Sequence, residues 1–181
     1  TGFGFTTPST VQVEVTDDSD VEVFYGVKTI SAEAGVFVTC SSAPTRCGFE
    51  VPFWIDYQNT GTVIGDVVIS LEIDSLTNFV SSTPTPDSII DNTIYWSHSN
   101  LPITHSGQIN LILQMPGVEY IGEYLTFTSR AELTSLDGSL SYLMSVGYRP
   151  QLNCAYDPND KLVEPQIPGN PNYTLFGDTL K

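Results

Sequence analysis

The stretch Cys47–Thr62, CGFEVPFWIDYQNTGT, decides the fold class of this chain. Apolar side chains recur in it at every second position: Val51, Phe53, Ile55 and Tyr57. The run then stops in Asn59-Thr60-Gly61-Thr62, small and polar residues typical of a turn. Alternation at period two is the pattern of a β-strand with one buried face. The stretch therefore predicts a half-buried strand that runs into a turn.

A second alternating run follows directly in Asp66–Asp74. Its inward positions would be Val67, Ile69, Leu71 and Ile73. We expect the two runs to pair as a β-hairpin across the Gly-bearing loop between them. An isolated hairpin is barely stable in water, so this one needs a second sheet over its apolar face.

Alternating apolar runs separated by turn residues occur throughout residues 28–153. Lys28–Ser42 is predicted as the first strand, and Ser81–Asp87 as a loop, because its prolines cannot donate to a β-ladder. Further inward faces are predicted at Ile94, Trp96 and His98, at Ile109, Leu111, Leu113 and Met115, at Leu125, Phe127, Ser129, Ala131 and Leu133, and at Leu140, Tyr142, Met144 and Val146. Turn signals at sandwich spacing and no amphipathic helix indicate an all-β fold: an immunoglobulin-like antiparallel β-sandwich of about seven strands.

Two shorter segments flank the predicted sandwich of residues 28–153. Residues 1–27 read as a hairpin that ends a preceding module, with Val11–Val15 and Val21–Tyr25 pairing around the acidic turn Asp17–Asp20. Residues 154–181 read as a junction, a Pro-rich linker and the first strand of a next module. We expect both ends to be ordered by strand contacts with neighbouring modules or identical subunits.

The charge balance excludes some partners. The 181 residues carry 21 acids against 6 lysines and arginines, a net charge of -15. Nucleic acids and anionic membrane surfaces attract basic proteins, so neither is an expected partner. No run of about 18 apolar residues occurs, and we expect no membrane insertion. An acidic, Lys-poor surface suits a secreted protein, and the predicted location is extracellular or on the cell surface.

The three cysteines, Cys40, Cys47 and Cys154, are too few and too widely spaced for a zinc cluster, and their odd number leaves one unpaired. One pairing is Cys47–Cys154, because the first and last strands of an immunoglobulin-like sandwich can run parallel. The alternative is Cys40–Cys47, which closes a short loop. Either disulfide would fit an extracellular protein.

Two motifs carry a resemblance to a known family. CGFEVPFWIDYQNTGT together with CAYDPNDKLVEPQIPG and the closing GDTLK resembles the repeated immunoglobulin-like modules of large secreted adhesins and cell-surface proteins of Bacteroidota, many exported by the type IX pathway. The resemblance covers roughly residues 40–181. It implies that DPNDK closes one module and leads into the next, a stalk or adhesive role, and no catalytic residues. TTPSTVQVEV and VEVFYGV, within residues 6–27, resemble the last strands of collagen-adhesin B-type modules.

One candidate metal site lies in the DPNDK motif, at the predicted junction with the next module. Asp157, Asn159 and Asp160 place oxygen ligands at positions that suit a hard cation such as Ca²⁺. The alternative is that Asp157 and Asn159 cap a turn through hydrogen bonds to the backbone and bind nothing. Ca²⁺ is the single cofactor that the sequence suggests.

Other side chains point to a rival function. Trp54 and Trp96 could form an aromatic platform for a sugar, although packing is the usual role of tryptophan in an alternating strand. His98 and His105 have no nucleophile or metal-ligand pattern beside them, so we interpret both as strand-edge or loop residues and predict no catalytic site.

Three Asp-Ser/Thr-aliphatic triplets resemble the O-glycosylation acceptor signal of Bacteroidota surface proteins. Their acceptor residues are Ser75, Ser88 and Thr179. Ser88 is the favoured acceptor, because a Pro-rich loop can accommodate a glycan.

The sequence therefore predicts a non-enzymatic extracellular structural module of a bacterial adhesin or surface filament, assembling in tandem or head to tail. The alternative is a carbohydrate-binding module or the accessory sandwich of a secreted hydrolase, for which glycans would be partners.

Overall fold

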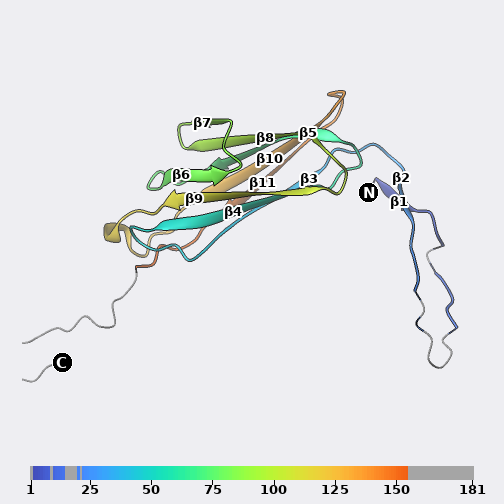
Figure 1. The fold of residues 1–181 in the computed structure, drawn as a ribbon, viewed down its shortest axis with the longest axis horizontal. Helices are drawn as coiled ribbons and strands as arrows, with labels where there is room; N and C mark the ends of the chain where they lie inside the picture. The colour runs from blue at the N-terminus through green and yellow to red at the C-terminus, as the bar shows by residue number, and fades with distance from the viewer. Residues whose placement is uncertain (1, 9, 15–19, 21, 155–181) are drawn as a thin grey trace, which may run out of the picture.

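The computed structural model describes residues 2–8, 10–14, 20 and 22–154, and most of them form an antiparallel β-sandwich (Figure 1). One sheet has four strands, in the order β3 (Val36–Ser42), β4 (Glu50–Asn59), β9 (Ser106–Gln114) and β6 (Asn78–Thr83). The other has five, in the order β11 (Ser141–Tyr148), β10 (Phe127–Ser135), β5 (Gly65–Glu72), β8 (Thr93–Leu101) and β7 (Ser88–Ile90). Within the described residues the helical content is one short 3₁₀ turn, Val118–Tyr120. The predicted all-β sandwich is confirmed, with nine strands in its two sheets instead of about seven.

The core lies between the two sheets and follows the predicted alternation in four strands, whereas Tyr142 of the edge strand β11, predicted to face inward, is exposed. The inward residues predicted for β4, β5, β9 and β10 are all buried. Phe53 of β4 and Phe127 of β10 meet across the sandwich with ring centroids 4.9 Å apart, and Tyr148 of β11 packs on both rings. Alternation every second residue puts these side chains on one face of each sheet, and their burial from water is the main stabilising contribution.

The predicted hairpin between the first two alternating runs is wrong. β4 pairs with β3 and β9, whereas β5 pairs with β8 and β10 in the other sheet. The chain therefore crosses from one sheet to the other between Asn59 and Gly65. Alternation shows which face of a strand is buried, but two strands that face the same core can lie in opposite sheets.

The sequence also missed two edge strands beside the Pro-rich loop. β6 includes Ser81–Thr83, which were predicted as loop, and the loop itself is limited to Pro84–Asp87. β6 has a register shift between Phe79 and Ser81 where it pairs with β9, so its burial does not alternate cleanly. β7 is short and exposed throughout. Neither strand has the pattern from which strands are predicted.

The N-terminal segment forms an arm beside the sandwich (Figure 1). Its strands are β1 (Phe3–Phe5) and β2 (Val27–Thr29), which pair antiparallel. Residues 10–14 and 22–26, where pairing was predicted, do not form strands. The predicted turn Asp17–Asp20 lies largely outside the described residues. The predicted first strand, Lys28–Ser42, is likewise divided into β2 and β3 by residues 30–35.

The chain enters and leaves the sandwich at opposite ends (Figure 1). The arm joins one end, which we call the entry end, where β3 begins and β4 finishes. Cys154, the last described residue, lies at the other end, which we call the exit end. No helix in the described part of the chain could span a membrane.

Candidate functional site: the two ends of the sandwich

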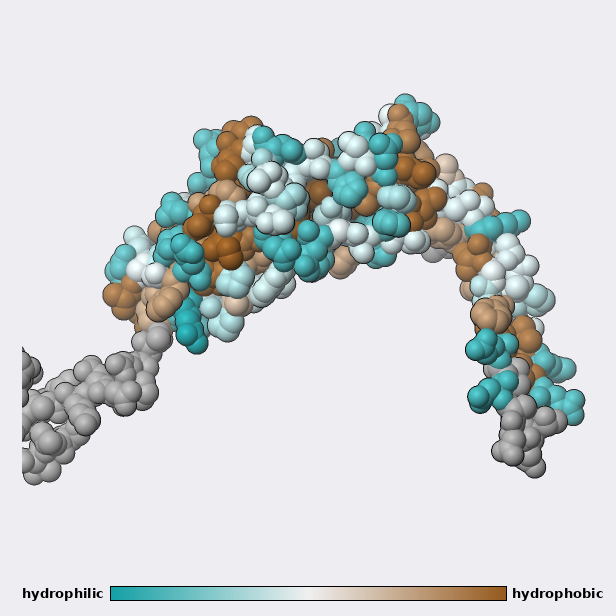
Figure 2. Space-filling view, in the orientation of Figure 1, coloured by the Kyte–Doolittle hydropathy of each residue, from teal (hydrophilic) through white to brown (hydrophobic). Residues whose placement is uncertain are grey.

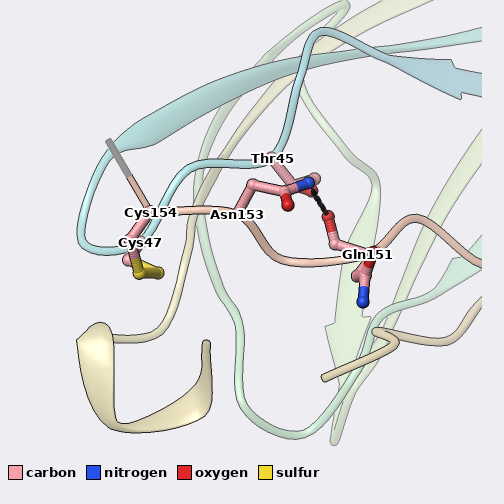
Figure 3. The surroundings of a disulfide bond; sticks show 5 residues. All are labelled: Thr45, Cys47, Gln151, Asn153 and Cys154. Carbon is pink, nitrogen blue, oxygen red and sulfur yellow. Dashed lines mark hydrogen bonds between the residues drawn. A yellow bond between two sulfur atoms is a disulfide. The ribbon is translucent and has the colours of Figure 1, made fainter. Parts of the chain in front are cut away.

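The exit segment, residues 150–154, is held between two other loops. On one side it lies parallel to residues 45–47, with an isolated bridge between Arg46 and Asn153. Asn153 N donates to Thr45 O at 2.9 Å, and Cys47 N donates to Asn153 O at 3.1 Å. The Thr45 hydroxyl adds a bond of 2.7 Å to Gln151 O, seen in Figure 3. These three hydrogen bonds form what we call the exit clamp.

The other side of the exit segment pairs antiparallel with residues 122–125. Leu152 N donates to Glu123 O at 2.8 Å, and Gly122 N donates to Leu152 O at 2.9 Å. The side chain of Leu152 is fully buried, and Thr45 is 2% exposed. The segment therefore packs into the end of the sandwich, and both of its backbone edges have partners.

A disulfide completes the exit clamp (Figure 3). It joins Cys47 to Cys154, whose Cα atoms are 4.9 Å apart, across 107 positions of sequence. The parallel course of residues 45–47 and 151–153 is what brings these two cysteines together. Of the two pairings that the sequence left open, the structure has Cys47–Cys154 and not Cys40–Cys47.

Cys40 is the free cysteine, on the inner face of β3. It is 6% exposed, and burial raises the pKa of its thiol to about 12. A thiol that stays protonated at neutral pH is a poor nucleophile and a poor metal ligand. Cys40 is therefore a packing residue of the core.

The QNTGT sequence forms a second clamp, at the entry end. Asn59, the last residue of β4, is fully buried. Its amide nitrogen donates to Val63 O at 2.8 Å and to Leu101 O at 3.0 Å, while its carbonyl oxygen accepts from Gly61 N at 3.0 Å. One side chain therefore satisfies three backbone groups where the chain crosses between the sheets.

Thr62 joins this crossover to the segment that enters the sandwich. Its hydroxyl donates to Ser31 O at 2.6 Å and accepts from Glu33 N at 2.8 Å. Gly61 lies so close to this segment that an added Cβ would come 2.5 Å from Glu33 O and 2.6 Å from Gly35 N. We call the contacts of Asn59, Gly61 and Thr62 the entry clamp. The sequence identified QNTGT as a motif, but its clamping role was missed, because hydrogen bonds between distant segments leave no periodic signal.

Exposed apolar side chains gather at both ends. On the arm they appear in brown and tan in Figure 2, and the described ones are Phe5, Val11, Val13, Val23, Phe24, Tyr25 and Val27. Around the exit segment they are Phe49, Val118, Ile121 and Tyr124, which we call the exit collar. Exposed apolar groups in clusters mark contact surfaces more often than single ones do.

The two tryptophans differ in what they can offer a ligand. Trp96 is 2% exposed and its indole N–H donates to Pro84 O at 3.2 Å, so the prediction of a sugar platform at Trp96 is wrong. Trp54 is half-buried on the outer face of β4, opposite Ser41 and Asn110. Of the two, it alone is partly exposed to solvent.

The two histidines lie at the entry end. His98, predicted to point inward, is exposed on β8, and its Nδ1 lies 3.0 Å from the hydroxyl of Tyr57. His105 lies in the turn before β9, where its backbone bonds Pro102 O and Asn59 N. The described residues hold no group of three metal-ligating side chains. The predicted Ca²⁺ ligands Asp157, Asn159 and Asp160 lie outside the described residues.

A separate hollow of about 260 Å³ lies on the outer face of the five-stranded sheet. It is lined by Val68, Ser70, Tyr95, Arg130, Glu132 and Leu143. The Arg130 guanidinium already bonds Glu72 at 3.1 Å, and Glu132 accepts from the Ser141 hydroxyl at 3.1 Å. Arg130 and Glu132 therefore already have partners within the sheet.

The candidate glycosylation sites fall in different settings. Ser75 is exposed in the turn after β5. Ser88 is exposed but is the first residue of β7, paired with Tyr95, and the prediction that it lies in the Pro-rich loop is wrong. Thr179 lies outside the described residues.

Comparisons with known proteins give only distant similarity. No protein-family model matches the sequence, and no curated protein is significantly similar to it. Among solved structures, the macrocyclisation catalyst AvmM of alchivemycin A biosynthesis shares 12% identity, covering 70% of this chain and 93% of its own, with a TM-score of 0.38. BslA, a bacterial hydrophobin, shares 14% identity over 68% of this chain and 97% of its own, with a TM-score of 0.40. MyfA, the major subunit of Myf fimbriae from Yersinia enterocolitica, shares 11% identity over 66% of this chain and 98% of its own, with a TM-score of 0.40. These three proteins have different roles, so the structural similarity does not indicate a function for this chain.

Proposed function

We propose that this chain is a non-enzymatic extracellular structural module of a bacterial surface adhesin or filament, linked to neighbouring modules through its two ends. The observation that carries the proposal is the pair of clamps. The chain enters at one end and leaves at the other, and both points are tied into the sandwich by hydrogen bonds, with a disulfide at the exit. A spacer between two neighbours needs this arrangement.

Two further features support an extracellular setting. Disulfides persist in oxidising compartments and are rare in reducing ones. The second feature is the resemblance of QNTGT and DPNDK to repeated modules of Bacteroidota surface proteins. Type IX export and glycosylation are part of the same proposal. The Ca²⁺ site at Asp157, Asn159 and Asp160 stays a prediction for the junction with the next module.

The contacts with neighbours are proposed at the apolar surfaces of the two ends. The arm of one module packs on the exit collar of the module before it, which covers side chains that are otherwise in water. A contact between two different surfaces repeats head to tail and builds an open filament.

The contact is tested by photocrosslinking in the native surface assembly. A photoreactive amino acid replaces Phe24 on the arm, which is 80% exposed, and in a matched control it replaces Leu143 on the outer face of β11, which is 58% exposed. We expect adducts from position 24 with residues 118–124 of another module and no such adducts from position 143. Adducts confined to the same module would contradict the proposal.

The carbohydrate-binding alternative is favoured by one observation, the half-buried ring of Trp54. Glycan-array binding that is lost in Trp54→Ala, with the fold retained, would establish the alternative. Absence of binding in both proteins agrees with a structural module.

A further inference from the structure

The Cys47–Cys154 disulfide changes the covalent path between the two ends of the sandwich. Without it, the path from the entry end to Cys154 passes through every strand of both sheets. With it, the path follows β3 to Cys47 and crosses directly to Cys154. The whole chain from β4 to β11 then forms a closed covalent loop beside this path.

The geometry of the exit clamp fits a load along the same axis. β3 runs from the entry end towards the exit end, and residues 45–47 continue beside residues 151–153 in a parallel arrangement. A pull outward on Cys154 and a pull on the entry end slide these two segments past each other. Asn153 N to Thr45 O, Cys47 N to Asn153 O and Thr45 Oγ1 to Gln151 O are then loaded together and not one after another.

The entry clamp lies where a load would enter the sandwich, just before β3. Thr62 bonds Ser31 and Glu33, which lie just before β3, so it holds the loaded segment against the crossover between the sheets. Asn59 fixes that crossover to β8 through Leu101 O. Tension that enters through the arm therefore meets the sandwich at a hydrogen-bonded anchor and leaves it at a covalent one.

We infer that the disulfide is a tension bypass: the covalent path between the two ends runs through β3 and the Cys47–Cys154 bond, so a load between the ends does not extend residues 48–153. The inference deepens the proposed function, because only a module joined at both ends is placed under tension. An adhesive domain or ligand surface on the closed loop would keep its fold while the module is pulled.

The bypass predicts a definite length. The loop spans 107 positions, and an extended chain covers at most about 3.3–3.6 Å per residue, so reduction adds about 350–385 Å of extensible chain. The path from Val36 to Cys47 extends to only about 40 Å, and β3 is already extended within it.

The test is single-molecule stretching of the full chain between two marker domains of known length. Oxidised protein is expected to show no unfolding step of about 350–385 Å, and protein with Cys47→Ser and Cys154→Ser is expected to show it. Cys40→Ala is the matched control, because it removes a thiol but leaves the bypass, and it should behave like the oxidised protein. A step of this length from oxidised protein would overturn the inference.

A second measurement covers the case in which the double variant does not fold. Oxidised wild type is held under constant force and dithiothreitol is added, which is oxidised to its cyclic disulfide as the two cysteine thiols form. The long step should then appear at a rate proportional to the reductant concentration. Its appearance without reductant, or its absence with reductant, would contradict the bypass. Both measurements use isolated molecules, so a failed bypass leaves the crosslinking test of neighbour contacts unaffected.

Discussion

Removing the exit disulfide should cost a large part of the stability of this domain. The change is the double variant Cys47→Ser and Cys154→Ser, which leaves the exit clamp with its hydrogen bonds alone. In the chain-entropy account, a cross-link stabilises by restricting the unfolded chain, and the restriction grows with the loop that it closes. For a separation of 107 positions the loss in the free energy of unfolding is about 4–5 kcal/mol.

This loss is large beside the total stability of a typical domain, about 5–15 kcal/mol. The assay is urea unfolding followed by tryptophan fluorescence, and thermal unfolding should show a midpoint lower by about 8–20 °C. Reductant is the control: it should destabilise the wild type by the same amount and leave the double variant unchanged. Without reductant, a difference below about 1 kcal/mol in the free energy of unfolding between wild type and double variant would refute the reasoning, because the closed loop would then restrict the unfolded chain very little.

Three further outcomes follow from the described contacts. Asn59→Ala removes the side-chain bonds to Val63 O, Leu101 O and Gly61 N, of which Gly61 N keeps its bond to Gly35 O, and should lower the free energy of unfolding by about 2–4 kcal/mol in urea; a loss within error would contradict the entry clamp. Hydrogen bonds from Ser135 and Ser139 lower the pKa of Asp137 from 3.8 to about 2, so its stabilising effect is complete above pH 4 and lost as the pH falls towards 2. The stability difference between wild type and Asp137→Asn should therefore vanish over that range, and a difference that persists at pH 2 would show another cause. Cys40, with a pKa of about 12, should not react with a thiol reagent at pH 8 in the folded protein, whereas denaturation without reductant should release one reactive thiol and not three.

The faces of the core strands could be read from the sequence, whereas their partners could not. Alternation in β4, β5, β9 and β10 reports burial on one side, which is a local property of each strand. The pairing of β4 with β9, and of β5 with β10, depends on where the chain crosses between sheets. That crossing is fixed by Asn59 and its contact with Leu101, 42 positions further along the chain. A bond between such distant residues leaves no pattern within either segment.

The edge strands and the arm show that alternation and strand formation do not always coincide. β6 and β7 are largely exposed and are separated by Pro84 and Pro86, so the sequence predicted a loop where part of β6 lies. In the arm, alternating valines predicted strands at residues 11–15 and 21–25, but the assigned pairing is between Phe3–Phe5 and Val27–Thr29. Period two is necessary for a half-buried strand, but it does not establish that a sheet covers it.

At the exit end, the sequence offered the correct pair of cysteines as one of two alternatives, through the parallel course of the first and last strands of a sandwich. It did not reach the clamp around them, because Thr45 and Gln151 have no distinguishing spacing. The hydroxyl of Thr45, a buried residue, donates its hydrogen bond to Gln151 O, 106 positions away. Such pairs become visible only when the fold brings the two segments together.

The most direct test of the structural role is the disulfide state of the protein taken from the surface of its native cells. The protein is denatured without reductant during recovery so that free thiols, including the buried Cys40, are blocked, and peptides are then mapped by mass spectrometry with and without reduction. The account predicts a Cys47–Cys154 linked peptide and a blocked, unpaired Cys40. Three blocked thiols, or a Cys40–Cys47 peptide, would contradict an extracellular module whose exit is covalently closed.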